Sequence, residues 1–198
     1  NNHCFGHIYI GANNIAYKKS EEKIKMRRLP TKISIILLIA PFIIACSPAI
    51  GVIGEVHEHA GLKVYVGGNA VNFSQKEYMS SENMTLSNFV HFHDKNGEIV
   101  HKHASGITLG FFFESLDIKF DARCLVIRGK DEYCNEKNKK LRMYVNGKQN
   151  YDYEKYEFND LDRILITYGN EKEEAIKQQI NLVTDEACIY SEKCPERG

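Results

Sequence analysis

The chain of 198 residues carries 26 Lys and Arg against 26 Asp and Glu, so its formal net charge is zero. The charge is unevenly distributed. Residues 1–45 hold seven basic and two acidic side chains, which leaves a net charge of −5 on residues 46–198. A mildly acidic domain without a basic patch argues against a nucleic acid as partner.

An export signal is predicted over residues 26–45. Its basic side chains come first, at Arg27, Arg28 and Lys32. The run 33–45 is apolar except for Ser34 and is too short for a membrane-spanning helix, which needs about 20 residues. Its end, Ile-Ile-Ala-Cys at 43–46, resembles a prokaryotic lipobox, in which the cysteine is lipid-modified. We therefore expect an extracytoplasmic protein anchored to the cell membrane through Cys46. The alternative is an ordinary signal peptide or an uncleaved anchor.

The signal also divides the chain. If translation begins at Met26, residues 1–25 are an upstream extension outside the fold, and their histidines and cysteine play no part in a site. Residues 46–54 are expected to form a tether, and residues 55–198 a single histidine-rich domain. A domain of about 150 residues buries roughly 70% of its unfolded surface, which is enough for a core.

The first half of the domain is predicted to form hairpins followed by a helix. Residues 62–66 are β-branched and aromatic, and Gly67-Gly68 predicts a turn before a second strand at 71–73. A polar loop at 80–87 precedes a hairpin over 88–106. Thr108 is expected to cap a helix from Leu109 to about Leu116 that buries its phenylalanines.

The second half adds further hairpins, a buried strand and two helices. The predicted elements are a hairpin over 125–133, a hairpin over 141–151 with its turn at Asn146-Gly147, a strand over 161–169, a helix over 171–182 and a short helix from Thr184. Together these elements predict an α+β fold: a mostly antiparallel sheet built from hairpins, with two or three short helices.

Six of the eight histidines form three H-x-H pairs within 47 residues: His57/His59, His91/His93 and His101/His103. Residues i and i+2 of a strand point to the same face, so each pair presents two imidazoles side by side. Imidazole is a common ligand of zinc, copper and nickel. The six histidines are therefore the predicted metal ligands, and a solvated, pH-responsive sheet face is the alternative.

The register of the middle hairpin decides whether two of these pairs share a face. A three-residue loop at 95–97, with Gly97 in the left-handed position, would pair His91 with His101 and His93 with Ile99. A two-residue turn at Asn96-Gly97 would put the pairs on opposite faces. The first register also gathers the apolar side chains on the other face, and we expect it for that reason.

Two carboxylates and the choice of ion complete the prediction. Asp94 and Glu58 are candidate ligands or orienters of ligands. No methionine lies beside the pairs, which disfavours Cu(I) and leaves Zn²⁺, slightly preferred, and Cu²⁺. Residues 91–98 also fit a cupin histidine motif, but without its preceding glycine.

Four cysteines remain after Cys46, at positions 124, 134, 188 and 194. An even number in an exported protein suggests two disulfides. Three connectivities are possible, and the local pairs Cys124–Cys134 and Cys188–Cys194 are the simplest. Free thiols used in redox or metal chemistry are the alternative.

The lipobox and several longer segments carry a family resemblance over residues 46–198. These segments are VHEHAGLKVYVGGNAVNFS, FVHFHDKNGEIVHKHASGITLGFFFESL, LRMYVNGK, DLDRILITYGN and TDEACIYSEKCPERG. They resemble a group of uncharacterised, exported prokaryotic histidine-rich lipoproteins that are often named protein-disulfide isomerases. The resemblance implies a redox activity that the four cysteines would have to carry, although the chain has no C-x-x-C motif.

Three functions follow from these features. The first is a membrane-anchored protein that binds zinc or copper through the H-x-H strands. The second is a thiol-disulfide oxidoreductase or isomerase, and the third is a metal-dependent hydrolase with Glu58 or Asp94 as base. The sequence identifies no protein partner.

Overall fold

The computed structural model describes residues 49–81, 84–129 and 131–196. The upstream extension, the signal peptide and Cys46 lie outside the described residues. Among the residues described, no helix is both long and apolar enough to cross a membrane.

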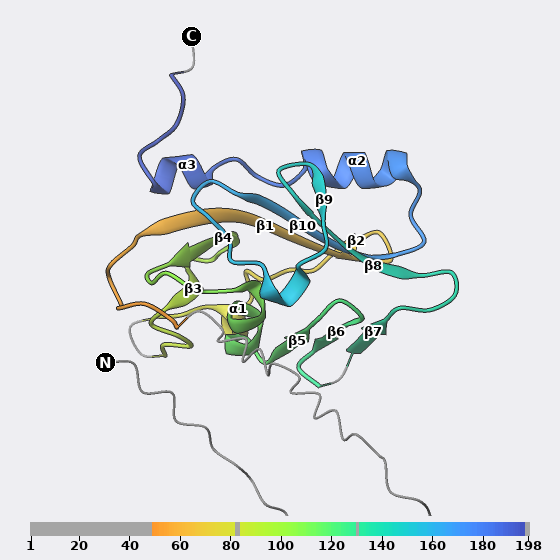
Figure 1. Cartoon of the computed structure of the whole chain (residues 1–198), viewed down its shortest axis with the longest axis horizontal. Helices are drawn as coiled ribbons and strands as arrows, with labels where there is room; N and C mark the ends of the chain where they lie inside the picture. The colour runs from red at the N-terminus through yellow and green to blue at the C-terminus, as the bar shows by residue number, and fades with distance from the viewer. Residues whose placement is uncertain (1–48, 82–83, 130, 197–198) are drawn as a thin grey trace, which may run out of the picture. The chain divides into compact units, whose positions relative to one another are not determined.

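A large mixed sheet forms the centre of the domain (Figure 1). Its strands, in spatial order, are β3 (Val90–His93), β4 (Asn96–Lys102), β1 (Glu58–Val66), β10 (Arg163–Gly169), β8 (Lys140–Val145) and β9 (Lys148–Asn150), with the short β2 (Asn69–Ala70) paired to β1. The β1–β10 pair is parallel and the other pairs are antiparallel. Strand β10 lies in the middle of the sheet and is nearly continuously apolar, as expected for a strand buried on both faces.

The two faces of the sheet are covered differently (Figure 1). One face packs against α1 (Leu109–Ser115) and a small sheet of β5 (Ile118–Phe120), β6 (Cys124–Ile127) and β7 (Asp131–Cys134). The other lies beneath α2 (Glu173–Asn181) and α3 (Ala187–Tyr190). Two short 3-10 helices, η1 (Lys76–Tyr78) and η2 (Tyr153–Lys155), lie in the connections.

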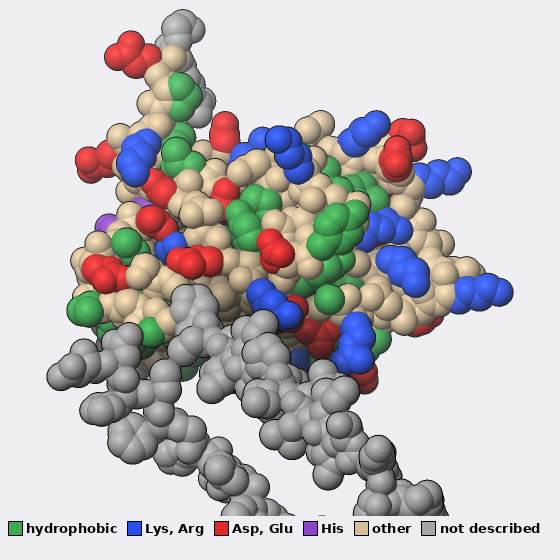
Figure 2. All heavy atoms as spheres, viewed as in Figure 1, with side chains coloured by type: hydrophobic (Ala, Val, Ile, Leu, Met, Phe, Trp, Pro, Cys, Tyr) green, Lys and Arg blue, Asp and Glu red, His purple; other side chains and the backbone are tan. Residues whose placement is uncertain are grey.

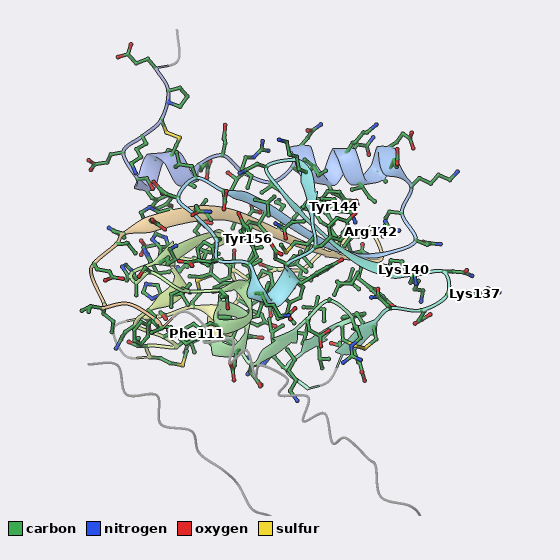
Figure 3. All side chains as sticks on the ribbon, viewed as in Figure 1. Phe111, Lys137, Lys140, Arg142, Tyr144 and Tyr156 are labelled. Atoms are coloured by element: carbon green, nitrogen blue, oxygen red, sulfur yellow. A yellow bond between two sulfur atoms is a disulfide. The ribbon has the colours of Figure 1, made fainter. Side chains whose placement is uncertain are left out.

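Alternation along β1 assigns its residues to these faces. Ala60, Leu62 and Val64 are buried in the main core with the α1 phenylalanines. Tyr65 belongs to a second, smaller cluster with Ile176 of α2. Tyr144 and Arg142 extend from β8 toward α2 (Figure 3), and Nη1 of Arg142 donates to the Glu171 carbonyl at 3.2 Å.

The predicted α+β class and its mostly antiparallel sheet are confirmed. Thr108 caps α1 as expected, accepting a hydrogen bond from the Phe111 amide at 3.3 Å. The turns at Gly67-Gly68 and Asn146-Gly147 have the positive φ angles of tight hairpins. The sequence did not predict the parallel β1–β10 pair. The C-terminal helix is shorter than expected, since it begins at Ala187.

Both local disulfides are present. Cys124 and Cys134 are directly opposite each other on β6 and β7, while the Cys188–Cys194 bond closes a ring over the end of α3. The described part of the predicted tether, residues 49–54, differs from expectation because it is hydrogen-bonded to the domain. The Gly51 and Gly54 amides donate to the carbonyls of Ser105 and His103.

Candidate metal centre

The three histidine pairs meet at one end of the sheet. Strands β3, β4 and β1 are neighbours, and their register places His91 opposite His101 and His101 opposite His59. One histidine from each of three adjacent strands therefore lies in a single row across the sheet. His59 and His101 are each only 1% exposed.

The other three histidines extend this row into a layer of six rings. The ring centre of His57, just before β1, is 4.6 Å from that of His59 and 4.9 Å from that of His103. The ring centres of His91 and His103 are 5.0 Å apart. Two imidazoles on one tetrahedral zinc have ring centres about 5 Å apart, given Zn–N bonds of about 2.0–2.1 Å. These three spacings therefore match that of imidazoles sharing an ion.

The turn of the β3–β4 hairpin differs from both sequence interpretations. The predicted His91–His101 pairing is present, but the loop consists of Asp94 and Lys95, with φ angles of 56° and 60°, and His93 pairs with Asn96. A β-bulge between His91 and His93 shifts the register, so that His91 pairs with His101 although His93 pairs with Asn96. Gly97 serves a different purpose, because a Cβ there would strike the Phe73 and Ser74 backbone.

Three of the histidines form a compact set of candidate ligands. His57, His59 and His101 each present a ring nitrogen, and these nitrogens lie within 4.8 Å of one another. Ligands of a tetrahedral zinc lie about 3.4 Å apart, so modest rotations of the side chains would close the set around one ion. This histidine triad can hold a metal ion.

Proton accounting fixes the tautomer of His59. The Ser191 hydroxyl donates to Oδ1 of Asp160 at 2.5 Å and is 2.7 Å from Nδ1 of His59. A hydroxyl has one proton and a carboxylate has none, so the Ser191 oxygen must accept from the Nδ1–H of His59. This leaves the lone pair of His59 on Nε2, as a histidine ligand oriented by a second residue requires.

A chain of two hydrogen bonds, from Asp94 through His93, orients His101. Nδ1 of His93 is 2.7 Å from a carboxylate oxygen of Asp94, and Nε2 of His93 is 3.0 Å from Nδ1 of His101. The carboxylate accepts from His93, which then accepts from the Nδ1–H of His101. Nε2 of His101 consequently carries a lone pair, and this buried atom has no hydrogen-bond partner among the described residues.

Burial keeps these imidazoles neutral. Burial and then the neighbouring histidines lower the pKa of His101 to about 2, and mainly the same causes lower the pKa values of His59 and His103 to about 4. Burial also lowers the pKa of His91, against the hydrogen bond to the Ser87 carbonyl. At neutral pH these rings are unprotonated, which is the form that binds metal.

The C-terminal segment covers His59 and His101, the two buried rings of the layer. The Tyr190 ring centre is 5.2 Å from that of His101 and 5.6 Å from that of His59, and its hydroxyl accepts from Asn96 at 3.1 Å. On the face drawn in Figure 2, histidine surface shows only in a small area beneath this segment, at the left edge. Sequence reasoning missed Tyr190, Ser191 and Asp160. The only signal for the first two was their position between Cys188 and Cys194.

The two predicted carboxylates have different surroundings. Asp94 contacts His93, whereas Glu58 forms an ion pair with Lys102 at 2.5 Å. Glu58 and Lys102 are directly opposite each other on β1 and β4, adjacent in sequence to His59 and His101, so they occupy the other face of the sheet. A second group, Cys124, Glu132 and Cys134, is also compact, but its thiols are joined in a disulfide and offer no thiolate.

No family model, curated protein or solved structure was found to match this chain.

Proposed function

We propose that this chain is an extracytoplasmic, membrane-anchored protein that binds a zinc or copper ion at the histidine layer. The triad of His57, His59 and His101 supplies the primary ligands. His103, whose ring centre is 4.9 Å from that of His57, is the candidate for a further ligand, and His93 orients His101. The observation that carries the proposal is the buried, unpartnered Nε2 of His101 beside two further imidazoles. A buried polar atom without a partner costs roughly 1–3 kcal/mol, which a bound ion would offset.

The donor set favours zinc and Cu²⁺ over Cu(I), Mg²⁺ and Ca²⁺. Neutral imidazole nitrogens suit both ions, and the triad contains neither the sulfur ligands that Cu(I) prefers nor the oxygen ligands that Mg²⁺ and Ca²⁺ require. Three histidines with a further position available are a common zinc arrangement, so zinc is the first choice.

The surroundings favour capture of an ion over catalysis. Glu58, a carboxylate that hydrolysis would need as base, is paired with Lys102 on the opposite face, and Asp94 is engaged by His93. Both cysteine pairs are closed, and neither has the C-x-x-C spacing of thiol oxidoreductases. Two disulfides are also typical of exported proteins, which supports the extracytoplasmic location.

Elemental analysis of the purified protein tests this proposal. We expect the wild type to retain about one equivalent of zinc or copper after exposure to the metal and gel filtration. The His59→Leu/His101→Leu variant should retain less than a tenth of that amount. Thr167→Val is the matched control, because Thr167 is another fully buried residue whose polar atom lacks a partner, on β10 opposite Tyr65. Equal metal content in the wild type and the double variant would overturn the proposal.

A further inference from the structure

The cover over the histidine layer is a small ring closed by a disulfide. Helix α3 contains only four residues (Figure 1), and the Cys188–Cys194 bond joins its second residue to a position just beyond its end. The ring contains Tyr190, Ser191 and Lys193, the three residues of the segment that contact the site or its supporting carboxylate.

These contacts converge on His59. Asp160 accepts hydrogen bonds from the Ser191 hydroxyl, the His59 amide at 3.0 Å and Nζ of Lys193 at 2.7 Å. The ring is therefore the part of the chain that brings Ser191 to Nδ1 of His59.

The disulfide joins two residues of the ring and fixes its conformation, while few contacts attach the ring to the rest of the domain. A four-residue helix is too short to be stable alone. Within α3 only Ala187 is buried, and Ile189 is 57% exposed. The remaining anchors are the packing of the Tyr190 ring on His59 and His101 and the polar contacts to Asp160 and Asn96. Opening the disulfide would therefore loosen the segment that covers His59 and His101.

We propose that the Cys188–Cys194 disulfide is a redox-sensitive lock on the histidine layer, whose reduction uncovers the layer and weakens metal binding. The inference rests on the proposed metal-binding function. Cys194 is exposed and Cys188 is half-buried, so a thiolate can reach the Cys194 sulfur.

The reductant is a dithiol. One of its thiolates attacks Cys194, breaks the S–S bond and releases the Cys188 thiolate, which takes up a proton. The second thiol of the reductant then displaces Cys194 from the mixed disulfide. The dithiol gives up two electrons and two protons and becomes a disulfide, while the protein gains two thiols.

A pair of double variants tests the lock without a reductant, which would itself bind metal. The Cys188→Ser/Cys194→Ser variant cannot close the ring, and Cys124→Ser/Cys134→Ser, which removes the disulfide of the β6–β7 hairpin, is the matched control. Circular dichroism establishes that both are folded, and competition with a chromophoric chelator measures zinc affinity. We expect the ring variant to bind zinc 10–100-fold more weakly than the wild type, the range found when supporting contacts of a metal ligand are removed, and the control to stay within twofold.

Three further measurements test the position of the cover and the effect of the redox state separately. Modification of His59 by diethyl pyrocarbonate, followed by mass spectrometry without metal, should be at least fivefold faster in the ring variant. Reducing Cys124→Ser/Cys134→Ser with a phosphine, removing the phosphine and titrating zinc should reproduce the affinity of the ring variant, and reoxidation should restore tight binding. Ser191→Ala should weaken binding while the ring stays closed.

The outcomes distinguish the two proposals. Unchanged or tighter zinc binding with the ring open would overturn the lock while leaving the metal site standing. Unchanged His59 reactivity would also overturn it, because the cover would not have moved. A wild type that binds neither zinc nor copper would overturn the metal-binding function and the lock with it.

Discussion

His101 combines two properties that are costly in a folded protein without a ligand. It is 1% exposed, and its Nε2 has no partner among the described residues. Its other nitrogen is satisfied by His93, so the ring is held in an orientation that leaves the lone pair free. Sites that break the rules of stable packing are expected where a protein binds something.

This conflict predicts opposite effects of one substitution on stability and binding. His101→Leu removes the unpartnered nitrogen, which costs roughly 1–3 kcal/mol, and forfeits the bond to His93, which contributes about 1 kcal/mol. We expect the metal-free variant to be as stable as the wild type or up to about 2 kcal/mol more stable by urea denaturation, and to lose metal binding. A variant that is much less stable and yet keeps its metal would contradict this account of His101.

Asp94 offers a finer test of how the ligands are oriented. Its carboxylate accepts from Nδ1 of His93, which in turn accepts from His101. Asp94→Ala removes the acceptor and should weaken zinc binding about 10-fold or more in a chelator competition. Asp94→Asn keeps an acceptor oxygen without the charge and should weaken it less. If both variants bind as the wild type does, Asp94 plays no part in the site.

At the scale of elements, the alternation of apolar and polar residues predicted which face of the sheet each side chain lies on. The glycine and asparagine residues predicted most turns. The alternation of Val90, Phe92 and Val100 with the histidines correctly placed His91 opposite His101, because these three apolar side chains belong in the core. The predicted loop at 95–97 was wrong, since the turn consists of Asp94 and Lys95. Gly97 was interpreted as a residue needed for positive φ, whereas it permits the close approach of the 73–74 backbone. A sequence does not distinguish these two uses of glycine.

Gly61 sets the position of the cover in the same way. A Cβ at this position in β1 would strike the Thr184 carbonyl oxygen in the connection from α2 to α3. Gly61→Ala should therefore destabilise the domain by about 1–3 kcal/mol, displace the cover and weaken zinc binding. Gly110→Ala, whose Cβ would meet the Glu154 carbonyl at 2.8 Å, should be destabilising while leaving the affinity unchanged. Equal zinc affinities in the two variants would show that the connection does not position the cover.

The path of the whole chain explains why the histidine ligands were predictable from the sequence while the residues that support them were not. The ligands come from short-range hairpins and one further strand, which alternation can align. The supporting groups come from distant parts of the chain, since Asp160 and Ser191 lie 101 and 132 residues from His59. They reach it because β10 pairs in parallel with β1 and the chain then returns over the same face through α2 and α3. No local pattern encodes that return.

The buried histidines also make the stability of the metal-free domain depend on pH. Their pKa in the unfolded chain is near 6.5, whereas in the folded domain it is about 4 for His59 and about 2 for His101. Between pH 6.5 and 5 the unfolded chain binds protons that the folded domain excludes, so the free energy of unfolding falls as the pH falls, by up to about 1.4 kcal/mol per pH unit for each histidine. Above about pH 7.5 these histidines are neutral in the unfolded chain as well, and the dependence disappears. Urea denaturation in the presence of a chelator measures this slope, and His59→Leu/His101→Leu should flatten it. An unfolding free energy that stays constant from pH 6.5 to 5 in the wild type would contradict the burial of neutral imidazoles.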